Sequence, residues 1–315
     1  MHKQPIQGIH HITAMASDPQ KNVDFYTQVL GQRLVKTTVN FDDPGTYHLY
    51  YGDNIGSPGT IMTFFPWPHA RRGRRGAGEV AASAYAILPS SLGFWRARLA
   101  EFEITFSEEV RFGETVLVFP DPDGMMIELV AREGDPAPTV WPNSPIAAEH
   151  ALRAFQGVTL WVNRAEGTAA VLTDIFGYKK VGEEGARHRY QGAGNIAQFV
   201  DLLVRPELGR GGMGAGSVHH VAFRTVDDGE QVLYQHEIAQ NGHGVTEVKD
   251  RQYFHSIYFR EPSGVLFEVA TDAPGFAYDE PVEELGSHLK LPLWLEPHRA
   301  KIEGLLPALQ IAEYA

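Results

Sequence analysis

The chain has 315 residues, 43% of them hydrophobic and 21% charged, which excludes a disordered chain and predicts one to three globular domains. It contains no cysteine, which excludes disulfides, iron–sulfur clusters and a cysteine nucleophile and leaves only nitrogen and oxygen ligands for any metal. A net charge of −12 argues against nucleic-acid binding, and the lack of an apolar signal or membrane segment indicates a cytoplasmic location.

The first predicted unit spans about residues 6–68 and begins with a short strand at residues 9–14, Ile-His-His-Ile-Thr-Ala. A helix is expected next, because Asp18 can cap it, Pro19 suits its first position and Gly31 ends it. Apolar segments interrupted by glycines follow, and we interpret them as three strands.

The same order of elements recurs three more times, at about 78–133, 150–205 and 213–275. The predicted strand and helix pairs of the middle copies are Ala81–Leu88 with Ser90–Phe102 and Phe155–Val162 with Glu166–Phe176. In the last copy a strand at 218–223 precedes a helix that ends at Gly242. The pattern therefore predicts four β-α-β-β-β modules.

A segment rich in proline, residues 134–145, is the predicted linker between the halves. We expect residues 1–140 to hold modules one and two and residues 146–280 to hold modules three and four. Residues 281–315 form a predicted C-terminal tail with a short helix over Arg299–Leu309.

Two repeated motifs carry the candidate chemistry. Residues 119–128 and 259–268 share the form F-x-[DE]-P-x-G-x-x-x-E, which predicts a β-hairpin with a glutamate on its second strand. Histidine doublets stand at 10–11 and 219–220, in the opening strands of modules one and four. Two histidines and one carboxylate are a common ligand set of oxygen-activating non-haem iron.

One histidine of each doublet and Glu268 or Glu128 are the candidate ligands, because neighbouring strand residues point to opposite faces. The module of Glu128 has no histidine doublet, so we expect the set to come from modules one and four. Module one must then pack beside module four in a metal domain that is discontinuous in sequence. For the other histidines, His48 among them, we expect surface or packing roles.

The repeats and several shorter strings resemble the vicinal oxygen chelate (glyoxalase/bleomycin resistance/extradiol dioxygenase) superfamily, and within it the hydroquinone ring-cleaving dioxygenases. The resemblance covers about residues 6–310. The supporting strings are residues 31–36, 47–50, 56–60, 182–190, 285–290 and 294–299.

The resemblance implies an α+β fold in which the four βαβββ modules form two curved-sheet domains. It implies His11, His220 and Glu268 as metal ligands. His10, His219 and Thr13 match positions that orient the ligands or line the dioxygen side, and Arg251 and Tyr258 match positions that contact the substrate.

The implied function is an Fe(II)-dependent dioxygenase, with Mn(II) as a possible metal, that opens a para-dihydroxy aromatic ring with O2. Its partners would be a small aromatic substrate and a second copy of the chain in a homo-oligomer. Two alternatives are a glyoxalase-like isomerase or lyase and a non-catalytic quinone-binding or drug-binding protein. The first usually needs a second metal-binding carboxylate, and Thr63 stands where module one would supply it.

Overall fold

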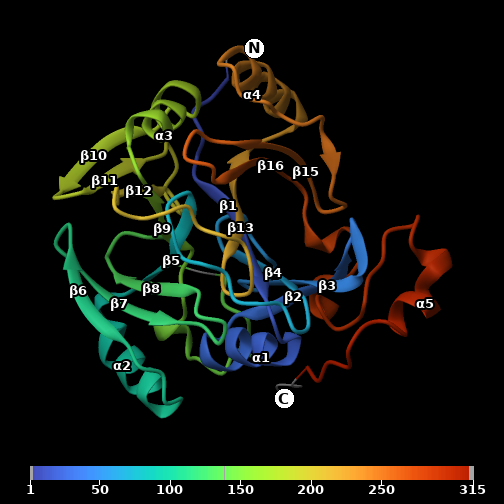
Figure 1. Cartoon of the computed structure of the whole chain (residues 1–315). Coiled ribbons are helices and arrows are strands. Elements are labelled where there is room, and N and C mark those ends of the chain that lie inside the picture. The colour runs from blue at the N-terminus through green and yellow to red at the C-terminus, as the bar shows by residue number, and fades with distance from the viewer. Residues whose placement is uncertain (1–2, 138, 312–315) are drawn as a thin grey trace.

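The computed structural model describes residues 3–137 and 139–311 and contains two curved sheets of eight strands each (Figure 1). The strand orders are β14-β15-β16-β13-β1-β4-β3-β2 and β10-β11-β12-β9-β5-β8-β7-β6. The predicted α+β class with four βαβββ modules is confirmed. The predicted linker and tail include residues 138 and 312–315, which lie outside the described part.

Modules one and four build the first sheet. Module one consists of β1 (Ile9–Ala16), α1 (Pro19–Asp24), β2 (Arg33–Asn40), β3 (Asp43–Gly52) and β4 (Ile61–Pro66). Module four consists of β13 (Val218–Thr225), α4 (Asp228–Gln240), β14 (Lys249–Asp250), β15 (Phe254–Arg260) and β16 (Leu266–Pro274). β1 joins them, because it pairs antiparallel with β13 and parallel with β4.

Modules two and three build the second sheet in the same way, with β5 paired to β9 at its centre. Module two consists of β5 (Glu79–Ile87), α2 (Leu92–Glu101), β6 (Ser107–Arg111), β7 (Glu114–Pro120) and β8 (Met126–Ala131). Module three consists of β9 (Phe155–Val162), α3 (Glu166–Ala170), β10 (Lys179–Glu184), β11 (Arg187–Gln191) and β12 (Phe199–Val204).

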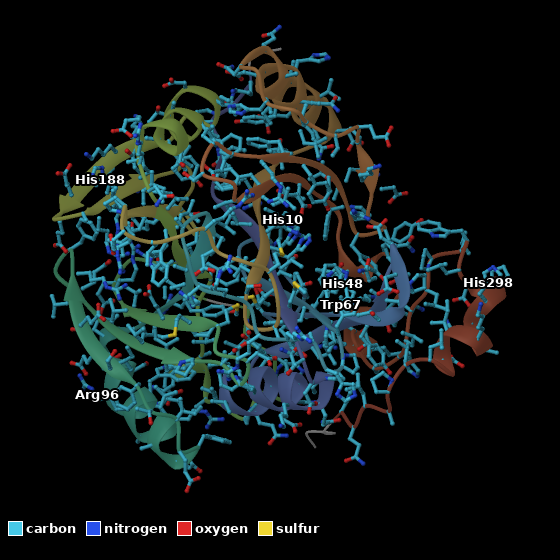
Figure 2. All side chains as sticks on the ribbon, in the orientation of Figure 1. His10, His48, Trp67, Arg96, His188 and His298 are labelled. Carbon is cyan, nitrogen blue, oxygen red and sulfur yellow. The ribbon has the colours of Figure 1, made fainter. Side chains whose placement is uncertain are left out.

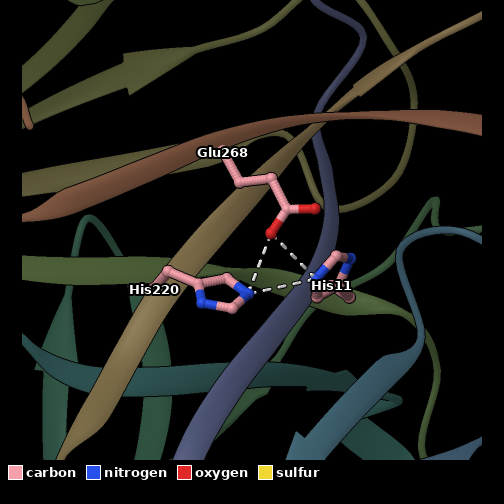
Figure 3. A group of neighbouring side chains, drawn as sticks. All are labelled: His11, His220 and Glu268. Carbon is pink, nitrogen blue, oxygen red and sulfur yellow. Dashed lines mark hydrogen bonds and ion pairs between the residues drawn. The ribbon is translucent and has the colours of Figure 1, made fainter. Parts of the chain in front are cut away.

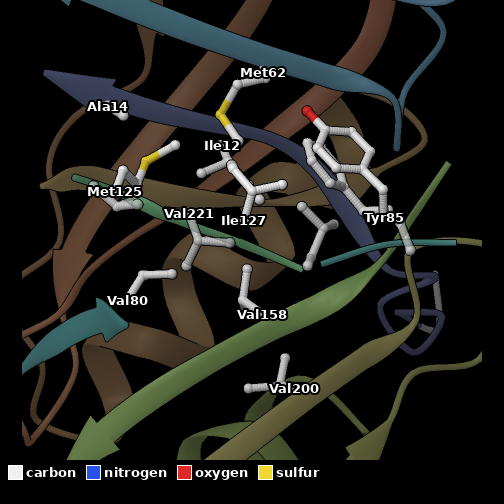
Figure 4. Close-up of a cluster of buried hydrophobic side chains, with 14 of the residues drawn as sticks. Ile12, Ala14, Met62, Val80, Tyr85, Met125, Ile127, Val158, Val200 and Val221 are labelled. Atoms are coloured by element: carbon white, nitrogen blue, oxygen red, sulfur yellow. The ribbon is translucent and has the colours of Figure 1, made fainter. Parts of the chain in front are cut away.

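The hydrophobic core lies between the two sheets (Figure 4). Ile12, Ala14 and Val221 of the first sheet point into it and meet side chains of the second sheet such as Ile127 and Val158. Because strand side chains alternate, the neighbours of these residues point to the opposite face of the first sheet. This face is therefore free to carry a polar site.

The tail helix is shorter than predicted. The helix α5 covers only Arg299–Glu303 and is preceded by a 3-10 turn, Glu296–His298. Gly304 and Pro307 explain the difference, because glycine is a poor helix former and proline cannot continue a helix. Within the described residues, no helix is both long and apolar enough to cross a bilayer.

The segment that leads into the tail is fixed to the first sheet through Lys36 of β2, which has no exposed surface. Its Nζ lies 2.6 Å from Asp279 Oδ1 and also bonds Glu280. Replacing Lys36 by methionine should lower the free energy of unfolding by about 3–5 kcal/mol, because two carboxylates would lose their cation. Urea titration measures the loss.

Lys180→Met is the control for this prediction. Lys180 pairs with Glu183 on the surface, where water screens the charges, so this variant should unfold like the parent protein. Equal stability of the Lys36→Met and Lys180→Met variants would contradict the proposed anchoring role of Lys36.

Candidate metal centre

Three buried side chains from three strands converge in the first sheet (Figure 3). His11 lies on β1, His220 on β13 and Glu268 on β16. The two Nε2 atoms are 3.3 Å apart, and Glu268 Oε2 is 2.9 Å from His220 Nε2 and 3.4 Å from His11 Nε2. The structure thus brings together the three ligands that the resemblance implied.

The triangle has the dimensions of a metal site. Two ligand atoms that are each about 2.1 Å from one ion and at right angles to each other lie about 3.0 Å apart. The three atoms can therefore occupy one face of an octahedron and leave the opposite positions free. Glu268 Oε2 is buried and accepts no hydrogen bond from the described residues, a costly arrangement that a bound cation would relieve.

The charges suit a divalent cation. Burial alone would raise the pKa of Glu268, but His11 and His220 hold it well below its usual range, so the carboxylate stays ionised. Burial lowers the pKa of His220. A neutral imidazole and an ionised carboxylate are the forms that bind metals.

The first histidine of each doublet contacts the second. His10 Nδ1 lies 2.9 Å from His11 Nδ1, and His219 Nδ1 lies 2.8 Å from His220 Nδ1. If the Nε2 atoms of His11 and His220 face a metal, their protons are on Nδ1 and donate to the neighbouring rings. Burial lowers the pKa of both neighbours, that of His219 to about 3, so they can accept these protons.

These contacts depend on two β-bulges that the sequence did not reveal. In the pairing of β1 with β13, the register shifts first between Ile9 and His11 of β1, whose partners are the adjacent residues Phe223 and Ala222. It shifts again on β13, where His220 and Val218 pair with the adjacent residues Thr13 and Ala14. The extra residue at each shift is the first histidine of a doublet. A bulge turns a side chain away from strict alternation, which places His10 and His219 against the ligands.

Two of the three candidate ligands, His11 and His220, line a cavity of about 380 Å³. Its walls combine aromatic rings with a few polar groups, as is common in small-molecule sites. The aromatic residues include Phe41, Tyr50, Phe65, Trp67, Phe254 and Tyr258, and the polar ones include Thr13, Asp42, His48, Thr246, Lys249 and Arg251.

Tyr258 and Arg251 form one unit in this cavity. Arg251 Nε donates to the Tyr258 hydroxyl at 3.2 Å, and Arg251 Nη1 lies 3.1 Å from Asp42 Oδ2 on the turn between β2 and β3. Burial and then Glu268 raise the pKa of Tyr258, so its phenol stays protonated. Because Arg251 already donates to this oxygen, the phenol proton is available for an acceptor in the cavity.

Thr13 also lines the cavity, and its hydroxyl is buried without a hydrogen-bond partner among the described residues. Thr13 and Ala222 each stand two residues after the second histidine of their doublet. In the sheet, Thr13 of β1 pairs with Thr63 of β4, and Ala222 of β13 pairs with Glu268 of β16. Thr63 therefore occupies the position in module one that Glu268 occupies in module four. In module two the matching carboxylate, Glu128, lies 2.7 Å from Arg111 instead.

The sequence predicts only a surface or packing role for His48, which Figure 2 labels. This prediction is incomplete, because His48 lines the cavity. Its Nδ1 lies 2.8 Å from the Tyr50 hydroxyl, and its Nε2 bonds the Thr63 hydroxyl. His48 and Tyr50 alternate along β3, so they share a face. That spacing, in the same module as His11, is the signal that could have placed His48 at the site.

Comparisons with known proteins agree with this geometry. Residues 8–129 and 154–269 match the family model described as "Glyoxalase/Bleomycin resistance protein/Dioxygenase superfamily". The chain is 50% identical over 301 residues to "Putative ring-cleaving dioxygenase MhqO" of Bacillus subtilis, covering 95% of this chain and 96% of the relative. It is 37% identical over 303 residues to "Chlorohydroquinone/hydroquinone 1,2-dioxygenase" of Sphingobium indicum, covering 92% and 93%.

Two solved structures place the fold. A crystal structure of a "putative dioxygenase" from Bacillus subtilis has a TM-score of 0.95 at 48% identity and covers 98% of this chain and 99% of its own. Glyoxalase I from Zea mays has a TM-score of 0.65 at 14% identity, covering 89% and 97%, which shows a shared fold alone. The chain belongs to the glyoxalase/bleomycin resistance protein/dioxygenase superfamily.

Proposed function

We propose that this protein is an Fe(II)-dependent dioxygenase that opens a hydroquinone-type ring with O2. The observation that carries the proposal is the buried triangle of His11, His220 and Glu268, whose two histidines line a largely aromatic cavity. Two histidines and one carboxylate on one face are the ligand set of many oxygen-activating iron sites. The names of the relatives in Bacillus subtilis and Sphingobium indicum support the reaction class and the substrate class.

His11, His220 and Glu268 would hold the iron. Bound iron would supply a centre at which the electron-rich ring and O2 exchange electrons. Mn(II) fits the same ligands, so the metal itself is part of the proposal. A cytoplasmic location and a homo-oligomer stay predictions.

The other residues bind and orient the substrate. The Tyr258 phenol donates to one substrate oxygen, and the positive charge of Arg251 favours the ionised form of that oxygen. The rings of Phe65, Trp67 and Phe254 give the aromatic substrate apolar walls. His10 and His219 keep the Nε2 atoms of the ligand histidines directed at the metal, and Thr13 offers a hydroxyl beside them.

An oxygen-uptake assay tests this function. Protein loaded with Fe(II) without oxygen is mixed with methylhydroquinone or chlorohydroquinone, and air is then admitted. We expect oxygen consumption together with loss of the aromatic absorbance. The same assay on Mn(II)-loaded protein shows whether Mn(II) also supports oxygen consumption. No oxygen uptake with any dihydroxyarene would defeat the proposal.

Asp42 supplies a further prediction, because it holds Arg251 from across the cavity. Asp42 is 76% exposed, so its ion pair contributes little energy. Asp42→Asn should raise the KM for the hydroquinone by about 2- to 5-fold and leave kcat unchanged. Steady-state oxygen uptake measures both constants.

Glu108→Gln is the matched control, since Glu108 of β6 pairs with Arg96 of α2 on the surface of the second sheet, away from this cavity. Its KM should equal that of the parent protein. A fall in kcat of Asp42→Asn at constant KM would show that Asp42 does not act by holding Arg251 for substrate binding.

A further inference from the structure

A second cavity, of about 260 Å³, lies against the proposed active site. Two residues, His219 and Leu266, line both this cavity and the one beside the metal ligands. His219 precedes a proposed ligand, and Leu266 stands at the start of β16, two residues before Glu268. The two cavities are therefore separated by a thin wall of side chains.

The second cavity is lined by two arginines. Arg260 Nη1 donates to the Gly264 carbonyl at 2.8 Å, and Arg210 is exposed. Within residues 3–137 and 139–311, no carboxylate forms an ion pair with Arg210. Glu79 also lines the cavity, but Arg75 Nε lies 2.8 Å from its Oε1 and offsets its charge. The charge that remains for a ligand is positive.

The wall that carries Arg210 is held firmly. The glycine-rich segment 209–216 pairs with the arginine-rich segment 71–77 through the bridges Arg74–Gly212 and Ala77–Arg210. A side chain at Gly76 would place its Cβ 2.4 Å from the Gly209 carbonyl oxygen, so the two segments approach as only glycine allows. The backbone of the arginine-rich segment thus fixes one wall of the second cavity.

The proposed reaction turns a neutral substrate into an anion. The ring bond between a hydroxyl-bearing carbon and its neighbour breaks, and each of these carbons gains one oxygen atom of O2. The ring loses four electrons and O2 gains four, so no other oxidant is needed. The hydroxyl-bearing carbon becomes a carboxyl group, which loses a proton to water at neutral pH, and the neighbour becomes an aldehyde or ketone.

We infer that the second cavity binds the carboxylate of this ring-opened product and receives it past His219 and Leu266. The inference rests on the proposed function. Arginine recognises carboxylates through paired N–H donors, whereas the uncharged diol gains nothing from a positive wall. The second cavity therefore binds the product more tightly than the substrate, and binding there moves the product away from the metal ligands.

Binding of a stable analogue tests this inference without turnover. The probe is cis,cis-muconate, an open six-carbon unsaturated dicarboxylate, titrated calorimetrically into Fe(II)-loaded protein without oxygen. Arg210→Gln should weaken muconate binding by about 10-fold, the value of one charge-assisted hydrogen bond. The matched control is Arg71→Gln, which removes the same charge from the neighbouring segment outside the cavity lining and should bind muconate like the parent protein.

Turnover gives a second measure in the same variants. Arg210→Gln should keep the initial rate and the KM for hydroquinone, while inhibition by accumulated product weakens by the same factor as muconate binding. Arg260→Gln should act in the same direction.

Equal muconate affinity in the parent protein and Arg210→Gln, or equal losses in Arg210→Gln and Arg71→Gln, would overturn the product site. Oxygen uptake with unchanged product inhibition would also overturn it while leaving the dioxygenase proposal intact. The absence of oxygen uptake with every dihydroxyarene would instead remove the proposed function, whatever the muconate result.

Discussion

The His220→Ala variant is expected to lose its iron. His220 Nε2 lies closer to Glu268 Oε2 than His11 Nε2 does, 2.9 Å against 3.4 Å, so its removal opens the triangle on its tightest side. Loss of one of three ligands should reduce bound iron to below about one tenth of the protein concentration and abolish oxygen uptake. Elemental analysis of protein purified without oxygen measures the iron.

His298→Ala is the control for this experiment, because His298 is exposed on the tail. It should keep the iron content of the parent protein. Circular dichroism shows whether His220→Ala still folds. A folded His220→Ala variant with stoichiometric iron would refute His220 as a ligand.

The Tyr258→Phe variant should bind iron normally and turn over slowly. Phenylalanine keeps the ring that packs edge-on to His220, with centroids 5.6 Å apart, and removes only the hydroxyl. Since the raised pKa keeps this hydroxyl protonated, the variant loses a hydrogen-bond donor to the reacting oxygen. Loss of one such donor lowers kcat by about 100- to 1,000-fold, and anaerobic iron loading followed by oxygen uptake separates binding from turnover.

Tyr178→Phe is the matched control for Tyr258→Phe. Tyr178 is buried in the core, and its hydroxyl has no hydrogen-bond partner among the described residues. Its loss should leave kcat unchanged. An equal kcat in the two variants would show that the Tyr258 hydroxyl does not act on the substrate.

The repeats made the architecture predictable. Modules one and four each open with a histidine doublet, and a glutamate follows the last turn of module four. Strand alternation and hairpin geometry are set by neighbouring residues, so they can be predicted from the sequence. Together they predict that these side chains share one face of one sheet. If His11 and Glu268 share a metal, module one must lie beside module four. In the observed strand order, β1 of module one lies next to β13 of module four.

The remaining parts of the site depend on contacts between distant segments. The bulges at His10 and His219 arise from the register of β1 against β13, which no single strand encodes. Asp42 reaches Arg251 across 209 positions of sequence. Likewise, the role of His48 depends on Thr63 and Tyr50 folding around it.

The central pairing of β1 with β13 has a consequence for how the protein is made. Of the proposed ligands, His11 is synthesised first and Glu268 last, 257 positions later. A nascent or truncated chain that stops before β16 lacks the carboxylate and cannot assemble the triangle. If the proposed ligands are correct, oxygen chemistry begins only after β16 has been made and has paired with β13.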